Sequence, residues 1–127
     1  MTPKQKEKAA IKASLDLLRS HSHFSLFGPR GPCHVVGKAA RFQNEDLFGE
    51  FDIAQFFGSL LFLIQVKHYH SGNISKAKRT IETNFAKAFY VTDPPLLLEV
   101  WGWMPEKMTM IRWAYDWETF QWKESWI

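Results

Sequence analysis

The clearest pattern of hydrophobic and polar positions lies between residues 48 and 66 and predicts a β-hairpin. Along residues 48–57 polar and apolar side chains alternate with the period of a strand. The alternation assigns these side chains to two faces, with Glu50, Asp52 and Ala54 on one and Phe51, Ile53 and Gln55 on the other. Residues 60–66 are almost wholly apolar, which is typical of a central strand buried on both faces. Gly58 and Ser59 between the two runs suit a tight turn.

An amphipathic helix is predicted before the hairpin, over residues 3–20. Thr2 is a favourable N-cap, Pro3 suits the first helical position, and Gln5 completes a capping pattern. Apolar residues then recur at helical spacing, namely Ile11, Leu15 and Leu18. Glu7 lies four residues before Ile11 and therefore at the inner edge of this helix.

The remaining elements define the fold class. A strand is expected over residues 33–42, a second helix over residues 74–89, and two strands over residues 96–103 and 108–115. Ser71-Gly72-Asn73 can cap the second helix, and residues 116–127 read equally well as a short helix or an extended tail. A helix between strands implies a crossover and at least one parallel pair. We therefore expect one α/β domain over residues 1–127, with a mixed five-stranded sheet flanked by helices in the order αβββαββ.

Composition and charge limit the classes of protein to which this chain can belong. The chain has 127 residues, of which 46% are hydrophobic, and a net charge of +3, which permits nucleic-acid binding without requiring it. The longest purely apolar run, residues 60–64, is far too short to cross a membrane, and lysines interrupt any signal-like segment at the N-terminus. Cys33 is the only cysteine, which excludes an internal disulfide and argues against a structural zinc site built on thiolates. We expect a cytoplasmic protein with no membrane partner.

Lys67 ends the apolar strand, where an ammonium requires a partner, and Asp52 on the neighbouring strand is the candidate. One interpretation is a structural ion pair at the sheet margin, and the other is a catalytic site. An acid entering one strand, followed thirteen residues later by Gln65-Val66-Lys67, resembles the core of the PD-(D/E)xK nuclease superfamily. Within it, the chain is similar to archaeal-type Holliday junction resolvases and their tailed-phage relatives, with the resemblance covering roughly residues 4–115.

The resemblance implies a restriction-endonuclease-like core and a site for metal-dependent hydrolysis of DNA. Its catalytic residues would be Glu7, Asp52, Gln65 and Lys67. Mg²⁺, or Mn²⁺ in its place, would be held by Glu7, Asp52, the Gln65 side-chain oxygen and the Val66 carbonyl. The family usually has an acid where this chain has Gln65, so the site carries one negative charge fewer. Three acidic alternatives remain open: Glu7 as an exposed partner of Lys8 or Lys12, Asp16 in place of Glu7, and Glu50 beside Asp52.

Basic residues border the expected site and predict contacts with DNA phosphates. They are Lys4, Lys8, Arg30, Lys38, Arg41, Lys76 and Arg79. Arg30 lies between two Gly-Pro pairs, so this segment is either a phosphate clamp or a simple turn. His68 and His70 are interpreted as polar residues at a strand end, with phosphate contact as the alternative.

Six tryptophans crowd the C-terminal third, and we expect much of this set to form a homodimer interface, with base stacking as the minority interpretation.

The predicted function is a homodimeric resolvase of branched double-stranded DNA such as four-way junctions. Two alternatives are another repair or transposition nuclease of the superfamily and a catalytically silent DNA-binding or assembly module of the same fold.

Overall fold

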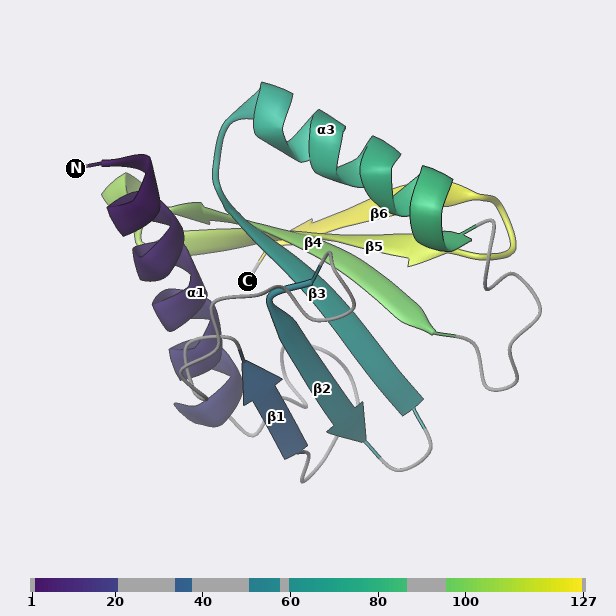
Figure 1. The fold of residues 1–127 in the computed structure, drawn as a ribbon, viewed down its shortest axis with the longest axis horizontal. Coiled ribbons are helices and arrows are strands. Elements are labelled where there is room, and N and C mark those ends of the chain that lie inside the picture. Colours follow the sequence, from purple (N-terminus) through teal and green to yellow (C-terminus); the bar gives the residue numbers. More distant parts are fainter. Residues whose placement is uncertain (1, 21–33, 38–50, 58–59, 87–95, 127) are drawn as a thin grey trace.

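The computed structural model describes residues 2–20, 34–37, 51–57, 60–86 and 96–126 (Figure 1). The elements in chain order are α1 (Pro3–Ser20), β1 (His34–Gly37), β2 (Ile53–Phe57), β3 (Leu60–His68), α3 (Ser71–Ile81) with a π-helical turn (Glu82–Ala86), β4 (Leu97–Met104), a 3-10 turn (Pro105–Lys107), β5 (Thr109–Asp116) and β6 (Gln121–Trp126). Within these residues, no helix has the length and hydropathy that a membrane span requires.

The strands form one sheet of six, in the order β1-β2-β3-β4-β5-β6. β3 and β4 are parallel, and every other neighbouring pair is antiparallel. α3 connects the parallel pair, so the predicted crossover and the mixed α/β sheet are confirmed. β6 extends the sheet beyond the strands that the sequence predicted. It lies where the chain was interpreted as a short helix or a tail, because residues 121–126 pair along their whole length with β5.

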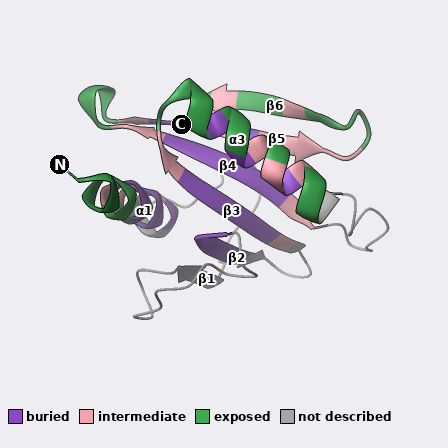
Figure 2. Cartoon of the chain, turned by 45° about the horizontal axis from the view of Figure 1, so that its top comes forward, coloured by how far each residue is buried: buried purple, intermediate pink, exposed green. Residues whose placement is uncertain are grey.

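Two hydrophobic clusters lie on the two faces of the sheet. Along β3, Leu63 belongs to the cluster that contains Ile74 and Ala77 of α3. Its neighbour Ile64 belongs to the cluster that contains Leu15 of α1. Because successive strand residues point to opposite faces, α1 and α3 cover opposite faces of the sheet. Figure 2 shows the buried residues concentrated along β3 and β4, with β6 mostly exposed or intermediate.

α1 begins as the sequence predicts. The amide of Thr2 donates to Gln5 Oε1 at 2.9 Å, and the amide of Gln5 donates to Thr2 Oγ1 at 3.2 Å. This reciprocal cap satisfies two donors that a helix N-terminus leaves without an internal partner. Ile11, Leu15 and Leu18 are buried against the sheet, as expected from their spacing. The cap therefore stabilises the first turn of α1, the helix that bears Glu7.

The predicted alternation of residues 48–57 is wrong at Asp52. Phe51 packs in the cluster beneath α3, whereas Ile53 packs in the cluster beneath α1, so these two residues do not share a face. The chain bends at Asp52, and β2 begins only at Ile53. A bend interrupts the alternation of side chains between the two faces of the sheet, which a regular strand would have continued. Residues 48–50, including Glu50, lie outside the described residues.

Several tryptophans pack within the protomer, so the buried ones are not available for the dimer interface that the sequence predicted. Trp101 and Trp113 are buried in the two clusters. The indole N–H of Trp117 donates to the Leu96 carbonyl at 2.7 Å, and that of Trp122 donates to Glu82 Oε1 at 2.5 Å. Trp126 is the exposed exception, at 59%. Indoles whose apolar surface is buried and whose N–H is bonded serve the fold of this chain.

Candidate functional site

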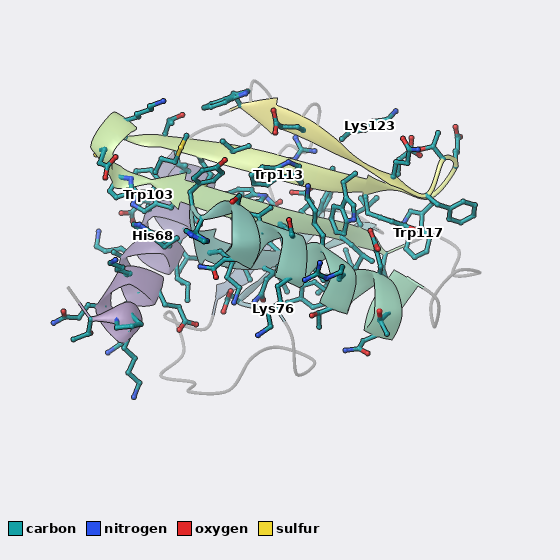
Figure 3. All side chains as sticks on the ribbon, turned by 90° about the horizontal axis from the view of Figure 1, so that it is seen from above. His68, Lys76, Trp103, Trp113, Trp117 and Lys123 are labelled. Carbon is teal, nitrogen blue, oxygen red and sulfur yellow. The ribbon has the colours of Figure 1, made fainter. Side chains whose placement is uncertain are left out.

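A cavity of about 460 Å³ opens at the carboxyl end of β3. The first turns of α1, the last residues of β3 and the start of α3 all contribute to its walls. Glu7, Val66 and Lys67 line it, and all three are residues of the predicted site. The other lining residues are Pro3, Lys6, His68, Tyr69, His70 and Asn73. Figure 3 shows His68 at this end of the molecule, close to α1, and Trp117 at the opposite end.

Asp52 is 1% exposed and is hydrogen-bonded to Val66, which lines this cavity. Its amide donates to the Ile64 carbonyl at 3.0 Å, and its Oδ2 accepts from the Val66 amide at 2.8 Å. The Asp52 side chain thus accepts a hydrogen bond from the Val66 amide of β3, at a point where the bent backbone is no longer in regular strand pairing. Backbone amides in a protein interior require such an acceptor. The Asp52 carboxylate is therefore joined by one hydrogen bond to a residue that lines the cavity.

Gln65 and Lys67 occupy the α3 face of the sheet. Gln65 pairs with Val100, which belongs to the cluster beneath α3, and Lys67 pairs with Gly102. Gln65 is 7% exposed. Glu7 comes from the opposite face, so the cavity lies at the sheet end where side chains from both faces meet. The structure brings Glu7, Val66 and Lys67 together there, whereas Asp52 and Gln65 are buried beside it and are not among the lining residues.

The start of α3 differs from the prediction. The N-cap is His70, whose Nδ1 accepts from the Gly72 amide at 3.2 Å, rather than a residue of Ser71-Gly72-Asn73. His70 also lines the same cavity as Lys67.

Glu7, rather than Asp16, is the α1 carboxylate at the site. Asp16 forms an exposed ion pair with Lys12, with Nζ and Oδ2 separated by 2.8 Å, and it does not line the cavity. The difference follows from helix geometry, since Asp16 belongs to the solvent face and Glu7 to the inner edge.

The predicted DNA contacts are only partly within the described residues. Lys4 and Lys8 are exposed on α1, and Lys76 and Arg79 are exposed on α3. Arg30, Lys38 and Arg41 lie outside the described residues.

Sequence reasoning missed Lys6 and Tyr69 as cavity residues. The charge of Lys6 beside Glu7 was a usable signal, whereas the place of Tyr69 depends on how α3 and β5 pack.

The predicted ligands offer the oxygen donors of a hard divalent cation, but of the four only Glu7 and Val66 line the cavity. Glu7 and Asp52 offer carboxylate oxygens, Gln65 an amide oxygen and Val66 a main-chain oxygen, which are the ligand types that Mg²⁺ accepts. Among the described residues, no three side chains of His, Cys, Asp or Glu are arranged to hold a metal ion. The proposed set contains only two such side chains, because Gln65 stands where a third acid would be.

Comparisons with protein-family models, curated proteins and solved structures found no significant match.

Proposed function

We propose that this protein is a metal-dependent DNA endonuclease that hydrolyses phosphodiesters, and specifically a structure-selective resolvase of four-way junctions. The observation that carries the proposal is the hydrogen bond from the Val66 amide to Asp52 Oδ2, at 2.8 Å. It joins the predicted acid to the Gln65-Val66-Lys67 stretch at a cavity that Glu7 also lines. The resemblance to PD-(D/E)xK nucleases involves the same stretch, with Gln65 where the family usually has an acid.

The residues of the site divide into two roles. Glu7, Asp52, the Gln65 side chain and the Val66 carbonyl would hold Mg²⁺, which when bound polarises the scissile phosphate and lowers the pKa of an attacking water. Lys67 supplies a positive charge at the cavity, where it orients that water or stabilises the charge that develops on the phosphate. Asp52 has a second role. Its hydrogen bond to the Val66 amide fixes the main chain immediately before Lys67.

A four-way junction suits a protein that reads shape rather than bases. Exposed Lys4 and Lys8 on α1 and Lys76 and Arg79 on α3 would contact backbone phosphates, which position DNA without reading its sequence. Paired nicks across a two-fold symmetric junction require two active sites, and a C2 homodimer supplies them. We therefore propose a homodimer, whose interface involves residues other than the buried tryptophans.

Cleavage of a labelled four-way junction, beside a linear duplex of the same sequence, tests the proposal. With Mg²⁺ the wild-type protein should nick the junction symmetrically and leave the linear duplex largely intact, and EDTA should abolish both reactions. Equal cleavage of the two substrates would favour another nuclease of the superfamily.

A catalytically silent DNA-binding or assembly module is the second candidate. Gln65 favours it, because a neutral amide attracts a divalent cation less strongly than a carboxylate does. Binding of the junction with no cleavage in either Mg²⁺ or Mn²⁺ would support this candidate against the nuclease.

A further inference from the structure

Tyr69 is an exposed aromatic residue at the rim of the cavity. It directly follows β3, lines the cavity beside Lys67 and His68, and is 39% exposed. Its backbone position is fixed, because its amide donates to the Trp103 carbonyl at 2.8 Å. The ring therefore projects from an ordered strand end rather than from a loop.

The Tyr69 ring is held in one orientation by its neighbours. It stacks on Trp113 with ring centroids 6.3 Å apart and an angle of 10° between the planes. Gly102 provides the space, since a Cβ at this position would lie 3.2 Å from Tyr69 Cδ2 and 3.2 Å from Trp113 Cζ3. Trp113 is itself fixed, with the Lys78 ammonium 4.8 Å from its ring centroid. An aromatic ring that is already ordered loses little conformational entropy when a ligand stacks on it.

The groups around Tyr69 identify the chemistry of the ligand. Lys6, Lys67, His68 and His70 line the same cavity as Tyr69, so nitrogen donors and the positive charge of the lysines share it with the Glu7 carboxylate. A phosphate group uses those donors, and a planar base uses the π-face of a tyrosine. An apolar peptide would occupy the ring but would leave the charges desolvated, which is costly. The combination fits a nucleotide.

We propose that Tyr69 is a stacking platform for an unpaired base of a DNA strand whose backbone phosphate lies against the lysines of the cavity. The proposal rests on the proposed function for the class of its ligand, and it adds a selectivity for branch points at which a base is unstacked. Base stacking tolerates any sequence, which agrees with recognition by shape.

The test measures binding without cleavage, in EDTA. The probe is a four-way junction with one unpaired 2-aminopurine at the branch point, whose fluorescence falls when the base stacks on an aromatic ring. Wild type and Tyr69→Phe should bind equally and quench the probe. Tyr69→Leu, which keeps apolar packing against Trp113 but has no π-face, should bind roughly tenfold more weakly and should not quench it. Phe120→Ala is the matched control, because Phe120 is an exposed aromatic (52%) in the turn between β5 and β6, at the other end of the sheet.

Quenching and affinity that are unchanged in Tyr69→Leu, with wild type binding the junction, would overturn the stacking role and leave the proposed function intact. An equal loss in Phe120→Ala would also overturn it. Failure of the wild-type protein to bind any branched DNA would instead overturn the proposed function, on which the ligand class depends.

Discussion

Asp52 and Glu99 are both buried carboxylates next to β3, yet their surroundings differ. They are 1% and 2% exposed. Glu99 pairs with Ile64 in the β3–β4 register, and its Oε1 lies 3.2 Å from Arg112 Nε and accepts from the Trp101 indole at 3.0 Å. Asp52 is on the other side of β3, where its Oδ2 accepts from the Val66 amide at 2.8 Å.

Under the proposed function, Glu99 is a carboxylate that serves the fold and Asp52 is one that takes part in the chemistry. Glu99, Trp101 and Arg112 lie on one face of the sheet and none of them lines the cavity, so the charge of Glu99 is matched within the core. Asp52 is bonded to a residue that does line the cavity. Burial alone therefore does not distinguish the two acids, whereas the hydrogen bond to a residue of the cavity makes Asp52 the candidate for a functional role.

Asp52→Asn should produce the largest effect. The amide oxygen of asparagine can still accept from the Val66 amide, so the fold and junction binding should survive while the charge is lost. We expect cleavage to fall by roughly 100-fold or more. Gel-based cleavage and binding assays on the same junction measure both properties. Near wild-type cleavage by this variant would remove Asp52 from the site.

Substitutions of Gln65 should have the next largest effect on cleavage. They test whether the charge at this position sets the metal concentration that cleavage needs. Gln65→Ala should cut roughly 10-fold more slowly or worse, because it removes an oxygen donor and leaves a space beside buried strand residues. Gln65→Glu should lower the Mg²⁺ concentration needed for half-maximal cleavage, since a carboxylate attracts the cation more strongly. In the wild type, Mn²⁺ should replace Mg²⁺ at lower concentration. Full activity of Gln65→Ala at every metal concentration would show that Gln65 is no ligand.

Glu99→Gln should affect stability rather than cleavage. It leaves the largely buried Arg112 guanidinium without its carboxylate, so urea unfolding should show a loss of roughly 2–3 kcal/mol. The expected loss lies below the range for fully buried pairs because the Arg112 side chain is 18% exposed. Below the unfolding transition, cleavage should remain within about twofold of wild type. A large loss of cleavage without a loss of stability would erase the contrast with Asp52.

Asp116 extends the comparison to a carboxylate whose partner, Lys123, is exposed, and it should give the smallest effect. A hydrogen bond from Lys123 holds the pKa of Asp116 at about 2, and the Glu118 amide adds to this. A lowered pKa in the folded state stabilises the protein above the unfolded pKa, and this contribution is lost as the pH falls from about 4 towards 2. The melting temperature of Asp116→Asn should be slightly below that of wild type near neutral pH, and the gap should close over that range. A difference in melting temperature that does not change with pH would contradict the lowered pKa of Asp116.

The helices and the β3 region were predictable because their signals are local. The Thr2–Gln5 cap and the spacing of Ile11, Leu15 and Leu18 define α1, and the apolar run of β3 matches a strand buried on both faces. Glu7 was assigned to the site through a family resemblance; it lines the cavity, and its role stays a prediction. Cleavage itself remains a prediction.

Other features depend on contacts that no local pattern reports. The bend at Asp52 exists because a side chain, rather than the main chain, accepts from the Val66 amide, and regular alternation assumes the opposite. β6 is an edge strand whose charges, Lys123 and Glu124, mask its alternation. Tyr69 reaches the cavity rim through its packing on Trp113 and Gly102, which are distant in sequence.

The central claim is that the cavity at the end of β3 is the active site, and Glu7 tests it most directly because only the fold brings α1 to that cavity. The measurement is the single-turnover rate of junction cleavage in Mg²⁺ for Glu7→Gln, with Asp16→Asn as the control on the same helix. We predict that Glu7→Gln lowers the rate by roughly 100-fold with the melting temperature unchanged, and that Asp16→Asn cuts as wild type does. A wild-type rate for Glu7→Gln, or an equal loss in Asp16→Asn, would contradict the account.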